Sequence, residues 1–406
     1  MTQASTENPY KFDYLLVITV AALLIIGLMM IYSATFALGY QVHDQPTYYF
    51  IRQLLWMSIG GLALILLARI EYHTWRRYSI LIMAITILLL GLVLLIGEAR
   101  FGGRRWLLNG SVQPSEFSKL AIIIYIADWL SSKGKQITKV SYGLIPFAIL
   151  LGFITGLVIL QRDLSTAVLI ASTALVMFFI AGGSLWQILF CGILGGSTIT
   201  FFIYRAAYRL DRIAIFLDPL GGDPLGDGYH IRQILIALGS GGLTGLGLGA
   251  SRQKFGYIPA SHTDGIFAII GEELGFIGGL VIISLFAFLA YRGFQIALAS
   301  RDSFGTVLAS GIICSLIFQA IVNVGVVTAS LPFTGIPLPF ISFGGSSLVV
   351  SMASIGLLLA ISRRTMPEEQ RLEKEERREI DRLRRRNRRA RVSSSGRRTR
   401  VKAPAH

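Results

Sequence analysis

The sequence predicts an all-α polytopic membrane protein with about ten transmembrane helices and one long outward-facing loop between the seventh and the eighth. Three observations lead to this fold class. Apolar residues make up 53% of the 406 residues and charged residues only 15%, against about 25% charged in an average soluble domain. The apolar residues fall in runs that suit bilayer crossings of about 20 helical residues each. The formal charge of +15 is concentrated in a short tail on this apolar body, so the basic balance does not indicate nucleic-acid binding.

Ten candidate spans follow one another along the chain. The first begins directly after residues 10–13 and runs on too long for a cleavable signal peptide. The fourth is short, and the fifth and sixth are separated only by Gln161-Arg162-Asp163, which predicts a tight helical hairpin. The ten spans are Tyr14–Ala34, Gln53–Ala68, Tyr78–Gly97, Phe117–Leu130, Leu144–Leu160, Leu164–Ala181, Leu185–Tyr204, Ile266–Tyr291, Phe304–Thr328 and Ser342–Ile361.

The basic C-terminal tail sets the predicted orientation. Residues 363–406 hold 17 basic and 7 acidic side chains. Because cytoplasmic segments are enriched in Lys and Arg, we place this tail in the cytoplasm, and the even number of spans places residues 1–13 there too. The prediction is a multi-pass protein of the plasma membrane with a ten-helix domain over residues 14–362. The tail itself is either disordered or partly helical, and contact with lipid headgroups is an alternative to a solvated tail.

Two outward-facing segments break the charge rule. The connection from Glu98 to Glu116 carries Arg100, Arg104 and Arg105, and the loop over residues 205–265 carries six basic residues. The usual connection has about 4–6 residues, so this loop is unusually long. Its apolar run over residues 231–238 predicts ordered short helices at the membrane surface.

A glycine-dense stretch, Gly241–Gly249, lies inside this loop. Glycine-rich backbone allows tight turns and the close approach of a ligand. Small residues are also common where helices pack in lipid. The sequence leaves both interpretations open.

Asp264 is the sharpest candidate for chemistry, because it stands where the long loop meets the eighth span. A carboxylate at a helix N-terminus is stabilised by the helix dipole and by free N–H groups, so one interpretation is an N-cap. The other is a general base that is held ionised and wetted at the membrane interface, within reach of a hydroxyl on a lipid-linked substrate.

Other charged residues are equally ambiguous. Glu272 and Glu273 follow Asp264 by eight and nine residues, and at that depth acidic side chains face protein or water. They either line a substrate cavity or belong to a buried structural network. Glu116 and Lys119, at i and i+3 on one helix face, are either an ion pair that anchors a short helix or part of a polar cavity. Asp163 has the same two interpretations.

The motifs of soluble enzymes are missing from the sequence. It holds no Walker phosphate loop, no dinucleotide-binding fingerprint, no G-x-S-x-G elbow and no paired His/Cys spacing for a metal. The five histidines are scattered, and the two cysteines, Cys191 and Cys314, lie inside apolar runs, which is typical of packing residues. Any chemistry must rely on carboxylates, arginines and a substrate that is already activated.

Several ordered motifs resemble those of the SEDS family (shape, elongation, division and sporulation), which includes FtsW, RodA and SpoVE. The likeness covers about residues 14–364. The motifs are Arg104-Arg105-Trp106, Gln113-Pro114-Ser115-Glu116 with Lys119, the stretch from Gln161 to Ala167, Gly228-Tyr229 through Ser240-Gly241-Gly242, His262-Thr263-Asp264 with Gly271-Glu272-Glu273-Leu274-Gly275, and the stretch from Thr334 to Ser347. The chain departs from the family pattern at Ala260, Gly265, Arg162 and Ser165, which leaves Asp264 in place but affects substrate positioning.

This resemblance implies peptidoglycan glycosyltransfer, in which lipid II is polymerised into glycan strands at the outer face of the plasma membrane. The essential aspartate of the family falls on Asp264, as the base that deprotonates the GlcNAc 4-hydroxyl of one substrate. That oxygen attacks the MurNAc anomeric carbon of the other and expels undecaprenyl pyrophosphate with inversion. Arginines aimed at the leaving group would stabilise its negative charge. The implied substrate-binding residues are Arg104, Arg105, Gln113, Ser115, Glu116, Lys119, Asp163, Arg212, Gln233, Ser240, Gly241, His262, Thr263, Glu272 and Ser342.

The resemblance also implies partners and a cellular role. Lipid II, the nascent glycan strand, the membrane and a class B penicillin-binding protein transpeptidase are the expected partners, with no nucleic acid. The resemblance assigns no cofactor and no metal-binding residue, and it leaves a divalent cation open. The N-terminal extension and the basic tail favour a division role like that of FtsW, whereas the short core spacing also suits elongation, as in RodA.

Two rival function classes stay open from the sequence. A lipid II flippase is kept open by Glu272 and Glu273, because transporters place ionisable residues near the bilayer midplane. A non-catalytic scaffold for cell-wall assembly is suggested by the tail. Most polar candidates lie at the outer ends of the spans, which favours chemistry at the membrane surface.

Overall fold

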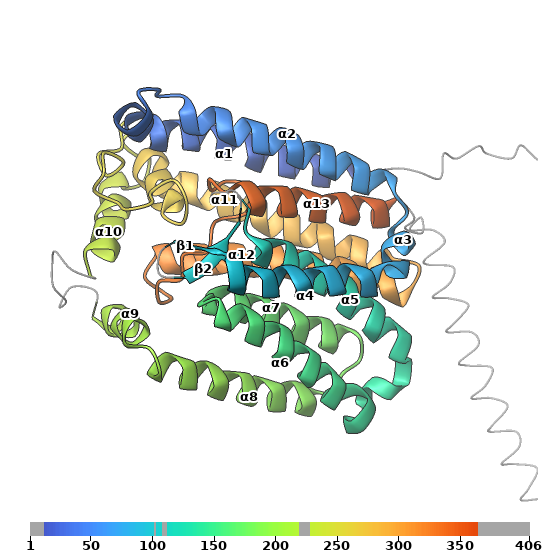
Figure 1. Ribbon diagram of the computed structural model, residues 1–406. Coiled ribbons are helices and arrows are strands. Elements are labelled where there is room, and N and C mark those ends of the chain that lie inside the picture. Colours follow the sequence, from blue (N-terminus) through green and yellow to red (C-terminus); the bar gives the residue numbers. More distant parts are fainter. Residues whose placement is uncertain (1–11, 101–102, 108–111, 219–227, 364–406) are drawn as a thin grey trace, which may run out of the picture. The chain divides into compact units, whose positions relative to one another are not determined.

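The computed structural model describes residues 12–100, 103–107, 112–218 and 228–363, apart from the side chains of residues 99–100, 103–104, 135 and 207. These residues form a bundle of long helices with short helices and a small hairpin at its ends (Figure 1). The elements are α1 (Tyr14–His43), α2 (Tyr48–Arg69), α3 (Tyr72–Arg77), α4 (Ser79–Ile96), β1 (Glu98–Arg100), β2 (Gly103–Trp106), α5 (Pro114–Lys133), a 3₁₀ turn (Gly134–Thr138), a π turn (Val140–Leu144), α6 (Ile145–Leu160), α7 (Leu164–Ile180), α8 (Leu185–Tyr204), α9 (Ala207–Leu217), α10 (Tyr229–Gly241), α11 (Ile266–Ala299), α12 (Ser303–Val327) and α13 (Gly345–Ser362).

Each of the ten predicted spans corresponds to one helix of this bundle, so the predicted fold class is confirmed. Within the described residues, eight helical segments are long and apolar enough to cross a membrane. The other two predicted spans match α7, which is apolar but has only 17 residues, and α5, which carries Glu116 and Lys119 on its first turns. The chain is a multi-pass membrane protein.

The predicted edges of the spans differ from the helix ends. Helix α1 continues nine residues beyond Ala34, to His43, because a helix extends past the hydrocarbon layer that hydropathy detects. Helix α13 begins at Gly345, so Ser342 lies in the preceding loop and not in a span. The two-stranded antiparallel hairpin β1–β2, which pairs Glu98 with Trp106, was not predicted and is a small departure from an all-α fold.

Helices α12 and α13 form the inside of the bundle, and α8 lies at its edge (Figure 1). In the most apolar stretch of each helix, 89% of the residues of α13 and 72% of those of α12 are buried, against 6% of those of α8. Helix α13 packs closely on α2, because Gly356 has no side chain where Leu64 approaches with its backbone carbonyl. The buried core therefore sits around α12 and α13, and apolar side chains of α8 face outward.

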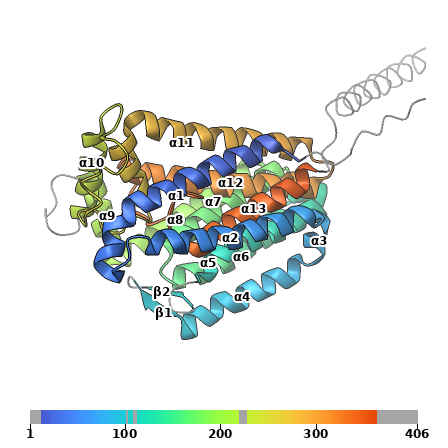
Figure 2. The same ribbon diagram turned by 90° about the horizontal axis from the view of Figure 1, so that it is seen from above.

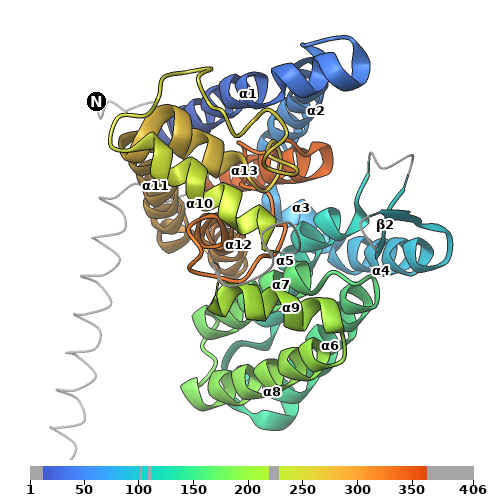
Figure 3. The ribbon, with the colours of Figure 1, turned by 90° about the vertical axis from the view of Figure 1, so that its left-hand side faces the viewer.

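The long loop is ordered where it is described, and it contains two short helices, α9 and α10, as predicted. Figures 1 and 2 show both helices at the same end of the bundle as the β1–β2 hairpin, whereas α3 lies at the opposite end, and Figure 3 is the view onto the end with α9 and α10. The first residues of α11 and α7 also lie at the end occupied by α9 and α10, which places the candidate site there.

Helix α11 is interrupted at Gly275, whose φ of 68° and ψ of −167° are not helical. The backbone groups that lose their helical partners at this break bond instead to the glycine-rich part of the loop. Leu246 N and Gly247 N donate to the carbonyls of Glu272 and Glu273, both at 3.0 Å. In return, the N–H groups of Phe276 and Ile277 donate to the carbonyls of residues 242 and 243. A broken spanning helix is tolerated where such partners replace its lost bonds.

Candidate active site

Asp264 lies at the junction of the long loop and α11, as the sequence predicted. Helix α11 has Gly265 as its N-cap, with no side-chain capping bond, so the interpretation of Asp264 as the N-cap is wrong. Instead, Thr263 Oγ1 donates to Asp264 Oδ1 at 2.9 Å. Gly335, with φ of 68°, lies beside the other carboxylate oxygen: a Cβ built there would come within 3.6 Å of Oδ2.

The backbone around Asp264 is held by two neighbouring elements. Asn323 of α12 is 1% exposed, and its Nδ2 donates to the carbonyls of Asp264 at 2.9 Å and Ile336 at 2.8 Å. Phe343 N donates to the carbonyl of His262 at 2.8 Å. The loop that carries Asp264 is therefore bonded to α12 and to the segment before α13.

The Asp264 side chain is buried more deeply than the sequence suggested. The residue is 9% exposed, although we expected a wetted carboxylate. Burial raises the pKa of Asp264, while the charge of His230 and hydrogen bonds from Thr263 and the backbone N–H groups of residues 264 and 265 lower it. A pKa shifted toward neutrality suits a general base better than that of an exposed carboxyl group.

A cavity of about 260 Å³ opens between α9, α10 and the segment after α12. Arg212 and His230 line it, and both interact electrostatically with Asp264, although Asp264 itself does not line it. The other lining residues are Tyr208, Asp211, Ile215, Phe216, Ile231, Ala329, Leu331, Pro332 and Phe333.

Arg212 is fixed at this cavity by aromatic contacts. Its guanidinium lies 5.7 Å from the ring centroid of Tyr208 and 5.3 Å from that of Phe333, and Nη1 donates to the Phe333 carbonyl at 3.3 Å. Burial lowers the pKa of Arg212, and Asp264 is among the groups that raise it. A stacked arginine at a cavity wall is a suitable partner for a phosphate group.

His230 is a site residue that the sequence analysis missed, since His262 was the only one of the five histidines assigned to the substrate site. Its ring lies 4.6 Å from that of Phe333, and among the described residues its buried Nε2 has no hydrogen-bond partner. Burial lowers the pKa of His230, Asp264 raises it and Arg212 lowers it. Its position at the start of the apolar run in the loop was the available signal.

A second polar group joins motifs that are distant in the sequence. Asp163 caps α7, with Oδ1 accepting from Thr166 N at 3.2 Å, and lies 3.9 Å from Arg105 Nη1. Gln113 Nε2 donates to Asp163 Oδ2 at 3.3 Å and to Ser115 Oγ at 3.0 Å. Arg105 also donates to the backbone carbonyls of residues 161 and 162. The structure thus brings together Arg105, Gln113, Ser115 and Asp163.

Glu116 and Lys119 form the expected ion pair, with 2.7 Å between Lys119 Nζ and Glu116 Oε2, and both are buried. Lys119 Nζ also donates to Gln319 Oε1 at 2.8 Å, and Gln319 Nε2 donates to the Pro337 carbonyl at 2.9 Å. Gln319 precedes Asn323 by four residues and so shares its helix face. One face of α12 therefore connects this pair to the backbone around Asp264.

Gln319 and Asn323 are further residues that the sequence analysis missed. Two amides four residues apart inside an apolar span were a readable signal, because polar side chains in such helices face protein or water. Ser342, which was predicted to bind substrate, bonds to the protein backbone, since its Oγ accepts from Leu338 N at 2.7 Å.

The remaining predicted residues make other contacts. His262 lies between the rings of Tyr49 and Phe343, at 5.2 and 5.5 Å, and burial lowers its pKa to about 4. Gln233, Ser240 and Gly241 are on α10. The oxygens of Glu272 accept bonds from residues 251–253. The backbone of Arg104 is in β2, but its side chain lies outside the described part of the chain.

No group of three or more His, Cys, Asp or Glu side chains that could hold a metal ion is found among the described residues. Asp264, His230 and Arg212 together offer a desolvated carboxylate that interacts electrostatically with a histidine and an arginine.

Comparison with known proteins identifies the family. The chain is 46% identical over 356 residues to stage V sporulation protein E of Bacillus subtilis, covering 86% of this chain and 97% of that one. It is 40% identical over 356 residues to a probable peptidoglycan glycosyltransferase FtsW of Trichlorobacter lovleyi, covering 87% and 93% of the two chains.

Solved structures agree with this assignment. A chain from a peptidoglycan synthase complex that coordinates polymerisation and crosslinking aligns with a TM-score of 0.73 at 29% identity, covering 88% of this chain and 99% of that chain. The rod shape determining protein RodA of Thermus thermophilus aligns with a TM-score of 0.66 at 28% identity, covering 88% and 98%. Residues 13–366 match the model of cell cycle proteins named for FtsW, RodA and SpoVE, and the chain therefore belongs to this family.

Proposed function

We propose that this chain is a peptidoglycan glycosyltransferase that polymerises lipid II into glycan strands at the outer face of the plasma membrane. The observation that carries the proposal is the buried Asp264 carboxylate, which interacts electrostatically with His230 and Arg212, two residues that line a cavity at one end of the bundle. The relatives named as probable FtsW glycosyltransferases support the same activity.

In the proposed reaction, Asp264 accepts the proton of the GlcNAc 4-hydroxyl of one lipid-linked substrate. The hydroxyl oxygen then forms a bond to the MurNAc anomeric carbon of the other substrate, on the face opposite the leaving group. The bond from that carbon to undecaprenyl pyrophosphate breaks, and the configuration is inverted. A raised pKa lets Asp264 take the proton more effectively near neutral pH than an ordinary carboxylate would.

Arg212 is our candidate for stabilising the pyrophosphate leaving group, because its guanidinium lines the cavity and is held by two rings. A fixed positive charge near the breaking bond lowers the barrier, since the negative charge develops in the transition state. The group around Arg105 and Asp163, together with the Glu116–Lys119 pair, is proposed as the second part of the substrate site.

This proposal is favoured over a flippase by the bonding of the residues that kept that rival open. Glu272 and Glu273 are 1% and 0% exposed, and their oxygens accept from loop residues 251–254 and from Ser33. They are engaged in the protein interior instead of lining a path across the bundle.

The cellular setting is proposed in the same way. We propose that both termini are cytoplasmic, which puts the end with α9 and α10 outside the cell, and that a class B penicillin-binding protein is the partner. The solved synthase complex supports such an assembly. A division role like that of FtsW is preferred to elongation. The proposed cytoplasmic tail, residues 363–406, lies outside the described residues after Arg363.

The test is polymerisation of labelled lipid II by the purified full-length chain, with products resolved by length. Asp264→Asn should lower the rate about 100- to 10,000-fold, the range for loss of a general base. Asp44→Asn is the matched control, because Asp44 is an exposed carboxylate at the end of α1 and Asn tolerates its positive φ. Full activity in Asp264→Asn would show that another group is the base.

A further inference from the structure

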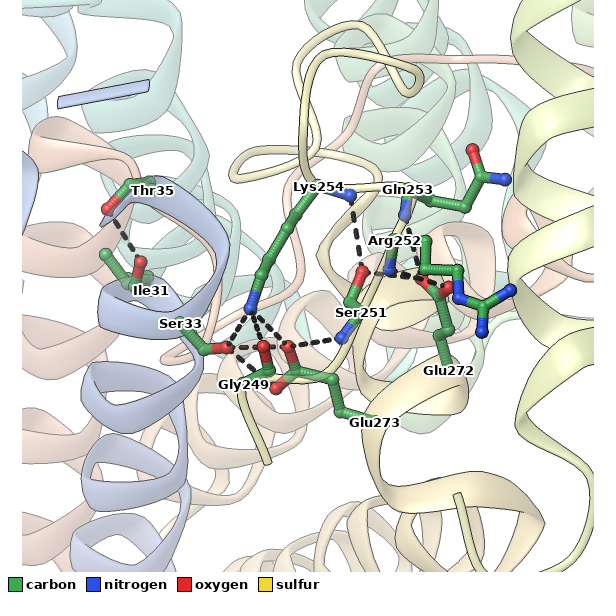
Figure 4. Close-up of polar contacts among 10 residues, drawn as sticks. All are labelled: Ile31, Ser33, Thr35, Gly249, Ser251, Arg252, Gln253, Lys254, Glu272 and Glu273. Carbon is green, nitrogen blue, oxygen red and sulfur yellow. Dashed lines mark hydrogen bonds and ion pairs between the residues drawn. The ribbon is translucent and has the colours of Figure 1, made fainter. Parts of the chain in front are cut away.

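The loop before Asp264 is bonded to α11 by buried charged side chains (Figure 4). Glu272 accepts three bonds from successive loop residues: Ser251 Oγ at 2.5 Å, Arg252 N at 3.0 Å and Gln253 N at 3.3 Å. A carboxylate that accepts several backbone and hydroxyl bonds fixes the loop in one geometry. The loop is therefore attached to α11 eight residues after Asp264.

Glu273 makes a second attachment that also includes α1. Lys254 Nζ lies 3.1 Å from Glu273 Oε1, and Ser33 Oγ of α1 donates to Glu273 at 2.6 and 2.8 Å. Lys254 Nζ further donates to the Gly249 carbonyl at 2.6 Å. Glu273 is 0% and Lys254 8% exposed, so this pair is buried, and we call Lys254, Glu273 and Ser33 the clamp.

The clamp closes a loop of chain that has Asp264 in its middle. Asp264 is ten residues after Lys254 and nine residues before Glu273. Since the two ends of this segment are joined by an ion pair, the conformations open to Asp264 are restricted by both sides of the chain. Ser33 ties the closed segment to the rest of the bundle.

The interruption of α11 makes this restriction necessary. At Gly275 the helix is no longer continuous, so residues 266–274 are not oriented by the long remainder of α11. Their last carbonyls bond instead to Leu246 and Gly247 of the loop. Gly245 permits this approach, because a Cβ at that position would overlap the Glu273 carbonyl.

We propose that Lys254 and Glu273 are positioning residues for the proposed reaction, which fix the Asp264 carboxylate in its buried position through the closed segment 254–273. Lys254 and Glu273 bond to the loop and to α1, so we assign their effect to the position of the base and not to substrate contact. The inference rests on the proposed role of Asp264. It adds the requirement that the Lys254–Glu273 pair be intact for full activity, which the burial of Asp264 does not imply.

The decisive experiment compares single and double neutral variants of the full-length chain in the lipid II polymerisation assay. Lys254→Met and Glu273→Gln each leave a buried charge unpaired, so both should lose thermal stability and activity. The double variant K254M/E273Q has no unpaired charge and should regain most of its Tm. Its kcat should stay about 10- to 100-fold below wild type, the effect of a small misplacement of a catalytic group, with KM little changed.

A matched control is available on the same helix. Arg292 of α11 pairs with Asp13 at 2.6 Å, at the opposite end of the helix from Asp264. The double variant D13N/R292M should leave kcat unchanged. Ser33→Ala removes only the tie to α1 and should fold, with kcat about five-fold lower, and Ser33→Thr should restore it.

The outcomes separate this inference from the proposed function. Wild-type kcat in K254M/E273Q or in Ser33→Ala overturns the positioning role, because the pair would then serve stability only. Full activity in Asp264→Asn, run in the same assay, overturns the proposed base instead. An inactive Asp264→Asn together with a fully active K254M/E273Q leaves the proposed function standing and removes the clamp from it.

Discussion

Asn323 offers the sharpest test of how the structure holds Asp264, because one amide nitrogen bonds two separate segments. Its Nδ2 donates to the carbonyls of Asp264 and Ile336 at 2.9 and 2.8 Å, and the residue is 1% exposed. The substitution Asn323→Leu keeps the branched shape and the number of side-chain heavy atoms, and its two methyl groups are larger than the amide atoms that they replace. It therefore creates little cavity and leaves two buried carbonyl groups without a donor.

The expected loss of stability follows from these two bonds. A buried polar group without a partner costs about 1–3 kcal/mol in soluble proteins, whereas hydrogen bonds between membrane helices average about 0.6 kcal/mol. The Asn323 amide is buried near the end of α12, so we expect a value between those for a soluble protein and for membrane helices. We expect Asn323→Leu to lower the free energy of unfolding by about 2 kcal/mol.

The effect on activity should be larger than this stability loss implies. Asp264 loses the bond to its own carbonyl, and a misplacement of about 1 Å can lower a rate about 100-fold. The assay is lipid II polymerisation at a temperature where the variant is still folded, with thermal unfolding measured in parallel. We expect kcat to fall about 10- to 100-fold.

Thr173→Val on α7 is the matched control. Its buried hydroxyl donates to Leu169 O at 2.8 Å within its own helix, so the variant loses a bond of the same kind without touching the loop around Asp264. It should keep wild-type kcat. If Asn323→Leu is destabilised but equally keeps wild-type kcat, the Asp264 backbone does not need this support and the reasoning is refuted.

The site and the loop give four further predictions. Because burial raises the pKa of Asp264, kcat should fall in acid at a higher pH than it would with an exposed carboxyl group as the base. His230→Gln should shift this fall to still higher pH, because it removes a charge that lowers the pKa of Asp264. A shift to lower pH would contradict the interaction between the two residues. A raised folded-state pKa favours the fold below the unfolded pKa, and this contribution is lost as pH rises through the folded pKa. Asp264→Asn should therefore raise Tm at neutral pH, and this gain should disappear in acid. The gain in the free energy of unfolding is about 1.4 kcal/mol for each pH unit that separates the folded-state pKa from the unfolded-state pKa. A gain in Tm that does not depend on pH would argue against a buried charge at Asp264. Gly245→Ala should lower the free energy of unfolding by more than about 2 kcal/mol, because its φ is 82° and the new Cβ would meet a helix carbonyl. Gly249→Ala has a similar φ of 80° but open space around the Cβ, so it should lower the free energy by about 1 kcal/mol. Equal losses of Tm would contradict the packing role of Gly245. Arg212→Lys keeps the charge but loses the stacking on two rings, so KM for lipid II should rise about ten-fold in steady-state kinetics, and an unchanged KM would exclude Arg212 from substrate binding.

The spans could be predicted from the sequence because the bilayer imposes a simple local rule. About 20 apolar residues are needed per crossing, and no information about neighbouring helices is required. The helical hairpin of α6 and α7 followed from the three residues between two apolar runs. Span edges were less accurate, as at Ser342, because helices begin and end according to caps and neighbours rather than hydropathy.

The interior of the long loop could not be predicted, because its structure depends on contacts between distant residues. Nothing near Glu273 in the sequence indicates that its partners are Lys254 and Ser33, which lies 240 residues away. The choice between ligand binding and packing for the glycine-dense stretch was open for the same reason. The bonds of residues 242–247 to the interrupted α11 show that this segment has a packing role.

The burial of Asp264 and the bonds around it are two sides of one physical requirement. A carboxylate gains basicity when it is removed from water, but that removal opposes folding in proportion to the rise in its pKa. The local segment cannot hold such a group by itself, since the helix that follows is broken at Gly275. The position must then be fixed from outside the segment, by Asn323 on one side and by the Lys254–Glu273 pair on the other. Functional groups in unfavourable environments persist where the surrounding structure over-determines them, and the bonds around Asp264 would give the base that we propose such support.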